Sequence, residues 1–369
     1  MNALIAKNDG FDMTELENVF FSIIRSAIGT DKVVESVQLT EKQWIDIFKM
    51  SKKQGLSAVI FEEIIAHDNN MPFNLKMEWA FHSDHIKERH ERQLAVTQDF
   101  ADLLSDNGIK MMLLKGNGLA LYYPRPELRE CGDIDIYCFG DYDKVNQLIV
   151  NEGIEIDEED SKHAHFFYKG VAVENHRMFN YELNAANKIV SRELMAHFDE
   201  NPVTDERIPN VFFADLNINA LYVMMHTLNH LPWSGIPVRN LVDWTLFLKE
   251  NHERLDWNYL GNIWKESGLL NAVVILSEIC KNFLGCKWFD LDAENKIKID
   301  DYQYVMYYIM NPWVESSATK NKFRKVQRKI DQYYRHKKMH FIVYQEHFPD
   351  SLLGTLFRYA FRIKKKEDY

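Results

Sequence analysis

Two aspartates stand two residues apart in the segment DIDIYC, where polar and apolar residues alternate. Alternate side chains of a strand project from one face, so Asp133 and Asp135 would lie side by side while Ile134 and Ile136 point into a core. Two like charges on one face repel each other unless a cation lies between them. Oxygen ligands on a rigid element suit a hard divalent ion, with positions left for water and phosphate. The pair predicts a site for Mg²⁺, or for Mn²⁺ in its place.

A third acidic residue lies further along the chain, in the alternating segment VAVENH. Val171 and Val173 share one face of this strand, and Glu174 and His176 share the other. A carboxylate on a neighbouring strand would complete a metal-binding triad with the two aspartates. We interpret His176 as a partner of the metal ligands or a substrate contact, and a buried, hydrogen-bonded core histidine is the alternative.

A glycine-containing turn, Lys115-Gly116-Asn117-Gly118, comes between an apolar strand over 109–114 and a helix expected over 119–123. Backbone N–H groups at such a turn can bind phosphate oxygens, and glycine allows the ligand to approach closely. Gly116 and Asn117 are therefore candidate nucleotide-binding residues.

Two cations near this turn are further candidates for phosphate binding. Lys115 would pair with a triphosphate or form an ion pair with one of the acids. Arg129 carries a guanidinium, which matches phosphate in a bidentate manner, and its alternative is a structural pairing with Glu127 or Glu130.

His226 and His230 stand four residues apart in a helical segment, a spacing that can bind zinc. No glutamate follows His226 as in H-E-x-x-H, and no third ligand is evident. We favour hydrogen bonding from this helix to the active site, with Arg239 and Asp243 nearby as substrate contacts or supporting residues.

The motif LLKG…YPRPELRECGDIDIY…VENH resembles the bacterial uncharacterised nucleotidyltransferase family of the polymerase-β nucleotidyltransferase superfamily, and LYVMMHTLNHLPWSGIPVRNLVDWTLFL matches its H-x3-H, R-x3-D pattern. The resemblance implies metal-dependent transfer of a nucleoside monophosphate from an NTP, with ATP the expected donor, and release of pyrophosphate. Asp133, Asp135 and Glu174 would be the catalytic and metal-binding residues. The acceptor would be a small molecule, a sugar or a protein. The alternative is a catalytically silent nucleotide-binding or regulatory module of the same fold.

The charge is distributed unevenly along the 369 residues. Residues 320–369 hold fourteen Lys/Arg and five Asp/Glu, while the preceding 319 hold thirty and fifty, giving balances of +9 and −20. An acidic body argues against a stable nucleic-acid complex, because phosphate contacts need clustered cations. The basic tail from Phe348 combines an apolar helical stripe with lysines, so it would pack on the body or contact an anionic membrane surface.

Helical patterns dominate both ends of the chain. Thr14 and Thr40 each begin a capping box, and residues 72–107 contain no glycine or proline after Pro72. Helices return from Asp215, and strands separated by short helices fill the middle. We expect an α+β fold, a mostly helical chain around a small mixed-sheet nucleotidyltransferase core.

We expect a helical N-terminal region over 1–107, the core over 108–205 and a helical C-terminal region with the basic tail over 206–369. No window has the 18 apolar residues of a membrane span, and four cysteines without a CxxC pair favour a reduced, cytoplasmic protein. Cys131 and Cys138 are expected to be small core residues rather than nucleophiles.

Overall fold

The chain begins with helices that pack against one another and against the C-terminal helices. The computed structural model describes residues 13–159, 162–179, 184–289, 291, 298–311 and 322–346. The N-terminal elements are α1 (Glu15–Ala27), β1 (Ser36–Val37), α2 (Glu41–Lys53), α3 (Ser57–Ile65) and β2 (Asp68–Asn69). Thr14 and Thr40 form the two expected capping boxes, which fix where α1 and α2 begin.

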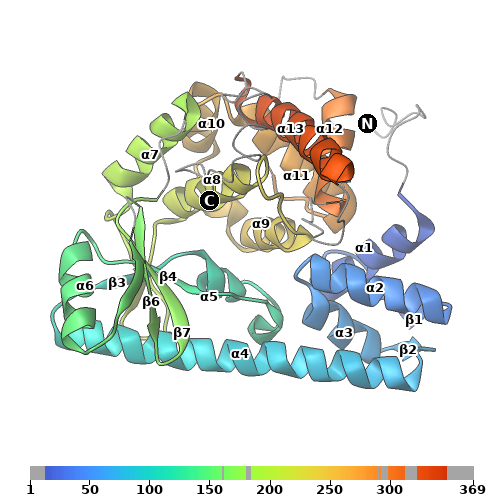
Figure 1. Cartoon of the computed structure of the whole chain (residues 1–369), viewed down its shortest axis with the longest axis horizontal. Coiled ribbons are helices and arrows are strands. Elements are labelled where there is room, and N and C mark those ends of the chain that lie inside the picture. The colour runs from blue at the N-terminus through green and yellow to red at the C-terminus, as the bar shows by residue number, and fades with distance from the viewer. Residues whose placement is uncertain are drawn as a thin grey trace.

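The helix α4 (Phe73–Asp106) is a single helix of 34 residues. It runs beneath both the N-terminal helices and the sheet, and so connects the two parts of the molecule (Figure 1). The segment without glycine or proline after Pro72 thus forms one continuous helix, since no residue in it breaks the helical hydrogen bonds.

A mixed sheet of seven strands forms the α/β part of the molecule, in the order β5-β6-β7-β4-β3-β9-β8. Its strands are β3 (Met111–Leu113), β4 (Ile134–Tyr137), β5 (Ile156–Glu159), β6 (His163–Tyr168), β7 (Val171–His176), β8 (Val203–Thr204) and β9 (Val211–Phe213). The pairs β4–β7 and β3–β9 are parallel, and the other four pairs are antiparallel. Lys169 and Gly170 both have positive φ and make the expected hairpin between β6 and β7.

The two faces of the sheet have different partners. Ile134, Ile136 and Val173 are buried in a cluster with side chains from the second half of α4 and from α6 (Tyr142–Asn151). Tyr137 belongs to a second cluster, which includes side chains of the C-terminal helices. The strand alternation predicted for β4 is therefore confirmed, and its polar positions face the helical C-terminal part.

The remaining described elements are helical. They are α5 (Lys115–Ala120), η1 (Pro126–Leu128), α7 (Ala185–His197), α8 (Leu216–His230), α9 (Val238–Asn251), η2 (His252–Arg254), α10 (Trp257–Glu266), α11 (Leu270–Leu284), α12 (Ile299–Met310) and α13 (Lys322–Tyr344). The helices α7 to α13 gather on one side of the sheet, opposite α4 (Figure 1). The mostly helical α+β architecture expected from the sequence is confirmed.

Two local expectations need correction. The helix after the glycine turn was expected over 119–123, but α5 already includes the turn and ends at Ala120. The strand β9 was not expected; it lies beyond residue 205 and pairs with β3, so the sheet extends past the proposed boundary of the core. Only three residues form β9, too few for an alternation pattern to reveal it.

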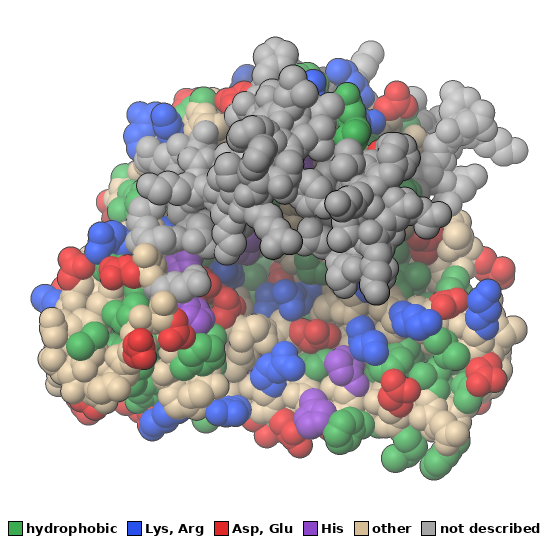
Figure 2. All heavy atoms as spheres, viewed as in Figure 1, with side chains coloured by type: hydrophobic (Ala, Val, Ile, Leu, Met, Phe, Trp, Pro, Cys, Tyr) green, Lys and Arg blue, Asp and Glu red, His purple; other side chains and the backbone are tan. Residues whose placement is uncertain are grey.

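Basic and acidic side chains are interspersed over the described part of the face in Figure 2. Among the described helices, none combines the length and the apolar character that a membrane span requires. The tail from Phe348, with its expected helix and membrane contact, lies outside the described residues.

Candidate active site

The register between two parallel strands brings the predicted acidic residues together. In the β4–β7 pair, Asp135 lies opposite Glu174 and Tyr137 lies opposite His176. Residues paired in register project from the same face, so these polar side chains meet on the face that the C-terminal helices cover.

Polar contacts join four side chains at this point. His176 Nε2 donates to Asp135 Oδ1 at 3.0 Å and lies 3.4 Å from Glu174 Oε2. Lys115 Nζ lies 2.9 Å from the same Asp135 Oδ1. Asp135 and His176 are 1% and 0% exposed, so water does not screen these contacts. Lys115 thus pairs with an acid in this structure, and His176 is buried with a hydrogen bond to one of the predicted metal ligands.

The charges of this cluster shift one another's pKa values. Burial disfavours the charged forms of both Lys115 and Asp135, but their mutual attraction outweighs it. The pKa of Lys115 is therefore raised, and that of Asp135 is held well below its usual range, with the His176 hydrogen bond adding to the effect. Burial raises the pKa of Glu174, but the hydrogen bond from His176 and the charges of His176 and Lys115 together outweigh it, so the pKa is also lowered. Both carboxylates are ionised at neutral pH.

Asp133 lies in the loop immediately before β4 and is less buried than Asp135. The Asp135 carboxylate, with burial second, raises the pKa of Asp133 to about 6. The group whose ligand atoms all lie within 4.8 Å of one another consists of Asp135, Glu174 and His176. Asp133 is outside this group, because β4 begins only at Ile134 and the strand face does not fix the aspartate beside its neighbour.

The glycine turn packs against the loop that carries Asp133. Gly116 has φ 48° and ψ −120°, and a Cβ there would lie 3.6 Å from the Asp133 carbonyl oxygen. Asn117 is 2% exposed, and its amide oxygen and nitrogen have no hydrogen-bond partner. The positive φ explains the glycine, whereas the Asn117 side chain is turned into the protein rather than toward a ligand.

Arg129 forms a buried ion pair with Asp243, rather than with Glu127 or Glu130. Its Nε and Nη2 donate to the two carboxylate oxygens at 2.8 Å each, and Tyr123 Oη donates to the same carboxylate at 2.8 Å. Burial opposes the charge of Arg129, but Asp243 outweighs it and raises the pKa of the guanidinium further. This pairing joins the loop before β4 to α9.

A pocket lies between this loop and the helices α8 and α9. We call it the α8–α9 pocket; its polar lining includes Lys115, Arg129, Asp133, Asp135, His226, Arg239, Asn240 and Asp243. The structure therefore brings both predicted aspartates together with His226, Arg239 and Asp243 of the distant H-x3-H and R-x3-D segments. The predicted residues His230 and Glu174 are not among those that line this pocket.

The two helical histidines are neutral at pH 7. Burial, and then the Lys115 ammonium, lower the pKa of His226 well below its usual range and that of His230 to about 4. Their rings lie 4.5 Å apart between centroids. No group of three possible ligands within the described residues includes either histidine.

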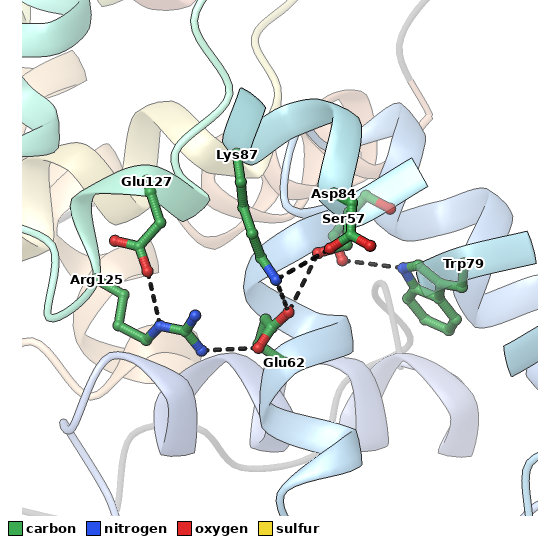
Figure 3. A network of polar contacts seen from close by, with 8 residues as sticks. Ser57, Glu62, Trp79, Asp84, Lys87, Arg125 and Glu127 are labelled. Carbon is green, nitrogen blue, oxygen red and sulfur yellow. Dashed lines mark hydrogen bonds and ion pairs between the residues drawn. The ribbon is translucent and has the colours of Figure 1, made fainter. Parts of the chain in front are cut away.

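An ion-pair network holds the loop between α5 and β4 against α3 and α4 (Figure 3). Glu62 of α3 pairs with Lys87 of α4 and accepts a hydrogen bond from Arg125 Nη1 at 2.7 Å. Arg125 also donates to Glu127 at 2.9 Å, within the same loop. Trp79 Nε1 donates to the Ser57 carbonyl oxygen at 3.0 Å. The long helix thus fixes the loop that ends at Asp133.

Sequence reasoning missed one histidine near the carboxylates. His163 lies opposite His176 in the β6–β7 pair, with the two rings stacked 5.4 Å apart, and its Nε2 is 3.8 Å from Glu174 Oε1. The alternation of HAHFFY was the available signal, since it puts His163 and His165 on one strand face.

A mixed sheet with carboxylates beside a pocket that Lys115, Arg129 and Arg239 line is a site suited to phosphoryl chemistry. The model of the uncharacterised nucleotidyltransferase family matches residues 40–285. The chain belongs to this family and is a transferase of the nucleotidyltransferase class. A search of curated proteins finds no match.

Proposed function

We propose that the protein transfers a nucleoside monophosphate from an NTP, with ATP the expected donor, to a small-molecule, sugar or protein acceptor and releases pyrophosphate. The observation that carries the proposal is the register of β4 and β7, which puts the Asp135 and Glu174 carboxylates side by side. Their lowered pKa values keep both charged at neutral pH, as cation binding requires.

The carboxylate cluster fits a divalent ion, for which we propose Mg²⁺ or Mn²⁺. Asp135 Oδ2 is buried and has no hydrogen-bond partner, although it belongs to an ionised group. Such an oxygen is costly to bury unless a cation or donor completes its contacts. Asp133, Asp135 and Glu174 would hold the ion, which when bound neutralises phosphate charge.

The surrounding residues would position the substrates. His176 fixes the orientation of Asp135 through the hydrogen bond to Oδ1. Lys115 can exchange its contact with Asp135 for one with a phosphate oxygen, because a lysine ammonium has three donors on a flexible stem. Glu174, which lies opposite Asp135 on β7, would orient the acceptor hydroxyl and take its proton.

The nucleotide would lie against the turn that carries Gly116 and Asn117. Arg129, locked to Asp243, would form a fixed wall of the pocket rather than a mobile clamp. His226 and His230 would contact the acceptor as neutral hydrogen-bonding groups, since their lowered pKa values keep them uncharged.

One observation favours the alternative of a catalytically silent nucleotide-binding module. The Lys115 ammonium lies 2.9 Å from Asp135, where it already supplies a positive charge to the carboxylates. A site neutralised by its own lysine has less need of a metal ion. This reading predicts tight NTP binding with no turnover.

The test is incubation of the protein with each NTP, labelled on its α-phosphate, together with Mg²⁺ and a cell extract. Transfer predicts label in an extract component and equimolar pyrophosphate, both absent without metal. The Asp143→Asn variant should behave as the wild type, because Asp143 is 88% exposed and its ion pair among the described residues is with Arg177. Nucleotide binding without label or pyrophosphate from any NTP would instead establish the silent module.

A further inference from the structure

Arg239 is the second residue of α9 and lines the α8–α9 pocket. Its Nη1 donates to the Glu130 carbonyl oxygen at 2.6 Å, which is a neutral acceptor. No carboxylate of the described residues lies within ion-pair distance of its guanidinium, and its Nε is buried without a hydrogen-bond partner. A buried donor of a charged group without an acceptor is costly, so this geometry is suited to receive an external anion.

The acidic residues near Arg239 already have partners of their own. Asp243 accepts both hydrogen bonds from Arg129, and the Glu130 carboxylate accepts one from the Ser57 backbone N–H at 3.1 Å. The Arg129–Asp243 pair therefore contributes no net charge. Burial raises the pKa of the Glu130 carboxyl, which also lines the pocket, so its charged form is disfavoured beside Arg239. The opposite end carries Asp133 and Asp135.

The Arg239 side chain is held in place before any ligand arrives. Its backbone N–H donates to the Gln54 carbonyl oxygen at 3.2 Å. A Cβ added to Gly55 would lie 3.4 Å from Arg239 Cδ and from Nη1, so the arginine stem packs along this glycine. The positive φ of 66° at Gly55 independently favours glycine there. A guanidinium fixed in this way loses little conformational entropy on binding.

The other polar groups at this end add hydrogen-bonding capacity without charge. Asn240 follows Arg239 in α9 and also lines the pocket, and His226 faces it from α8 in its neutral form. An anion bound by Arg239 would thus meet further donors. The two carboxyl groups near it are that of Asp243, which Arg129 neutralises, and that of Glu130, which accepts a hydrogen bond from the Ser57 backbone.

We propose that Arg239 is an anion-binding residue that holds a phosphate group of a substrate in the α8–α9 pocket. Phosphate is favoured because the planar guanidinium matches two of its oxygens at once, and because the proposed function, on which this choice rests, handles phosphates. The group belongs either to the polyphosphate of the NTP or to a phosphorylated acceptor.

The experiment measures the binding of pyrophosphate and inorganic phosphate to the full chain by calorimetry at constant ionic strength. The variant R239M keeps an apolar stem along Gly55 and removes the guanidinium. We expect it to weaken pyrophosphate binding about tenfold or more, the usual effect of losing a charged hydrogen-bonding pair. The variant R239K keeps the charge but not the planar fork, and we expect about a threefold loss.

The matched control is R92M. Arg92 is exposed on α4, and like Arg239 it makes a hydrogen bond to a backbone carbonyl oxygen, that of Lys169. Binding to R92M should stay within twofold of the wild type, since a distant surface charge is screened by salt. Should R239M fail to fold, the loss expected for R239K still tests the proposal.

Two further titrations distinguish the sources of the phosphate. If the NTP supplies it, R239M weakens ATP about as much as pyrophosphate and leaves adenosine unchanged. If the acceptor supplies it, ATP affinity is unchanged and inorganic phosphate no longer binds to the ATP-loaded variant. Equal affinity of wild type, R239M and R239K for all these ligands, or no binding to wild type, would overturn the proposal. If R239M loses pyrophosphate affinity as expected while the wild type shows no turnover, the anion-binding role of Arg239 stands and only the proposed transfer is rejected.

Discussion

Two buried ion pairs flank the same pocket and differ in how completely their groups are satisfied. In the Arg129–Asp243 pair, both carboxylate oxygens accept hydrogen bonds, and Tyr123 adds a third. In the Lys115–Asp135 pair, Lys115 and His176 share Oδ1, while Oδ2 has no partner. The first pair is complete in itself, whereas the second leaves an ionised oxygen that needs another cation or donor.

The surroundings of the two pairs sharpen this contrast. Asp133 and Glu174 add two carboxyl groups beside Asp135. The Asp135 charge, followed by burial and by the Glu174 charge, raises the pKa of Asp133. Around Asp243 the charges balance. Buried ion pairs with full hydrogen bonding fix geometry, while an excess of like charge stores repulsion that a ligand can relieve. We therefore assign a structural role to Asp243 and a ligand-binding role to Asp135.

The largest effect is expected from Asp135→Asn. The amide keeps the shape of the side chain but removes the charge that a divalent ion requires, so turnover should fall about a thousandfold. Initial rates of pyrophosphate release with saturating NTP measure this, with Asp143→Asn as the control. A rate within tenfold of wild type would contradict the assigned role.

The Asp243→Asn substitution should affect folding most. It leaves the Arg129 guanidinium buried without its carboxylate, which typically lowers the free energy of unfolding by about 3 kcal/mol. Urea unfolding followed by tryptophan fluorescence checks the value. The double variant Arg129→Met/Asp243→Leu should lose less than Asp243→Asn alone, because no charge then stays buried; a larger loss would argue against a structural pair.

The Glu174→Gln substitution separates nucleotide binding from catalysis beside the Lys115–Asp135 pair. If Glu174 accepts the acceptor's proton, turnover should fall about a hundredfold while NTP affinity stays within severalfold of wild type. Parallel measurement of kcat and of NTP affinity by calorimetry decides this. Loss of affinity with unchanged kcat would show that the carboxylate serves nucleotide binding instead.

The stored repulsion predicts a pH-dependent stability for Asp133→Asn. The pKa of Asp133 is about 6 in the folded protein and near 4 when unfolded, so the folded state holds the proton more tightly. Below pH 4 the Asp133 carboxyl is protonated in the folded protein and this stability contribution is fully present. It is lost as the pH rises through 6. The variant should therefore be about 1–2 kcal/mol more stable than wild type at pH 7.5 and equal to it near pH 3.5. Urea unfolding at both pH values gives the answer; no gain at pH 7.5 would contradict the repulsion.

The smallest effect concerns the network in Figure 3. Glu62 is 13% exposed and contacts both Lys87 and Arg125, so Glu62→Gln should cost about 1 kcal/mol of unfolding free energy. Glu127→Gln is the control, because Glu127 is 32% exposed and pairs with Arg125 alone. Thermal unfolding measures both variants, and the loss of unfolding free energy in Glu127→Gln should be less than half that in Glu62→Gln. Equal losses would show that the network does not hold the loop.

Local patterns were sufficient to predict most elements near the site. Alternation predicted β7 over Val171–His176, and a helical pattern predicted α6 over Tyr142–Asn151. Both elements depend on which faces of consecutive residues are apolar, which the sequence shows directly. The short strand β9 and the ends of α5 depend instead on hydrogen bonds to distant segments, and no local pattern reveals those.

The candidate site divides in the same way. The residue types and their two-residue spacing were enough to select Asp133, Asp135 and Glu174, because strand geometry puts alternate side chains on one face. They were not enough to show that Asp133 precedes the strand and that His176 stands in its place among the closest ligand atoms. That result follows from where β4 begins to pair with β7.

What the sequence by itself determined is the chemistry available: carboxylates on strands, a glycine turn and basic residues on later helices. What only the tertiary structure decided is which charges meet. Arg129 and Arg239 are both basic residues near acidic ones in sequence, yet the first is consumed by Asp243, 114 residues away, and the second has no carboxylate partner among the described residues. Local spacing cannot distinguish them, because ion pairing in a protein interior depends on distances set by the packing of α8 and α9 against the loop before β4.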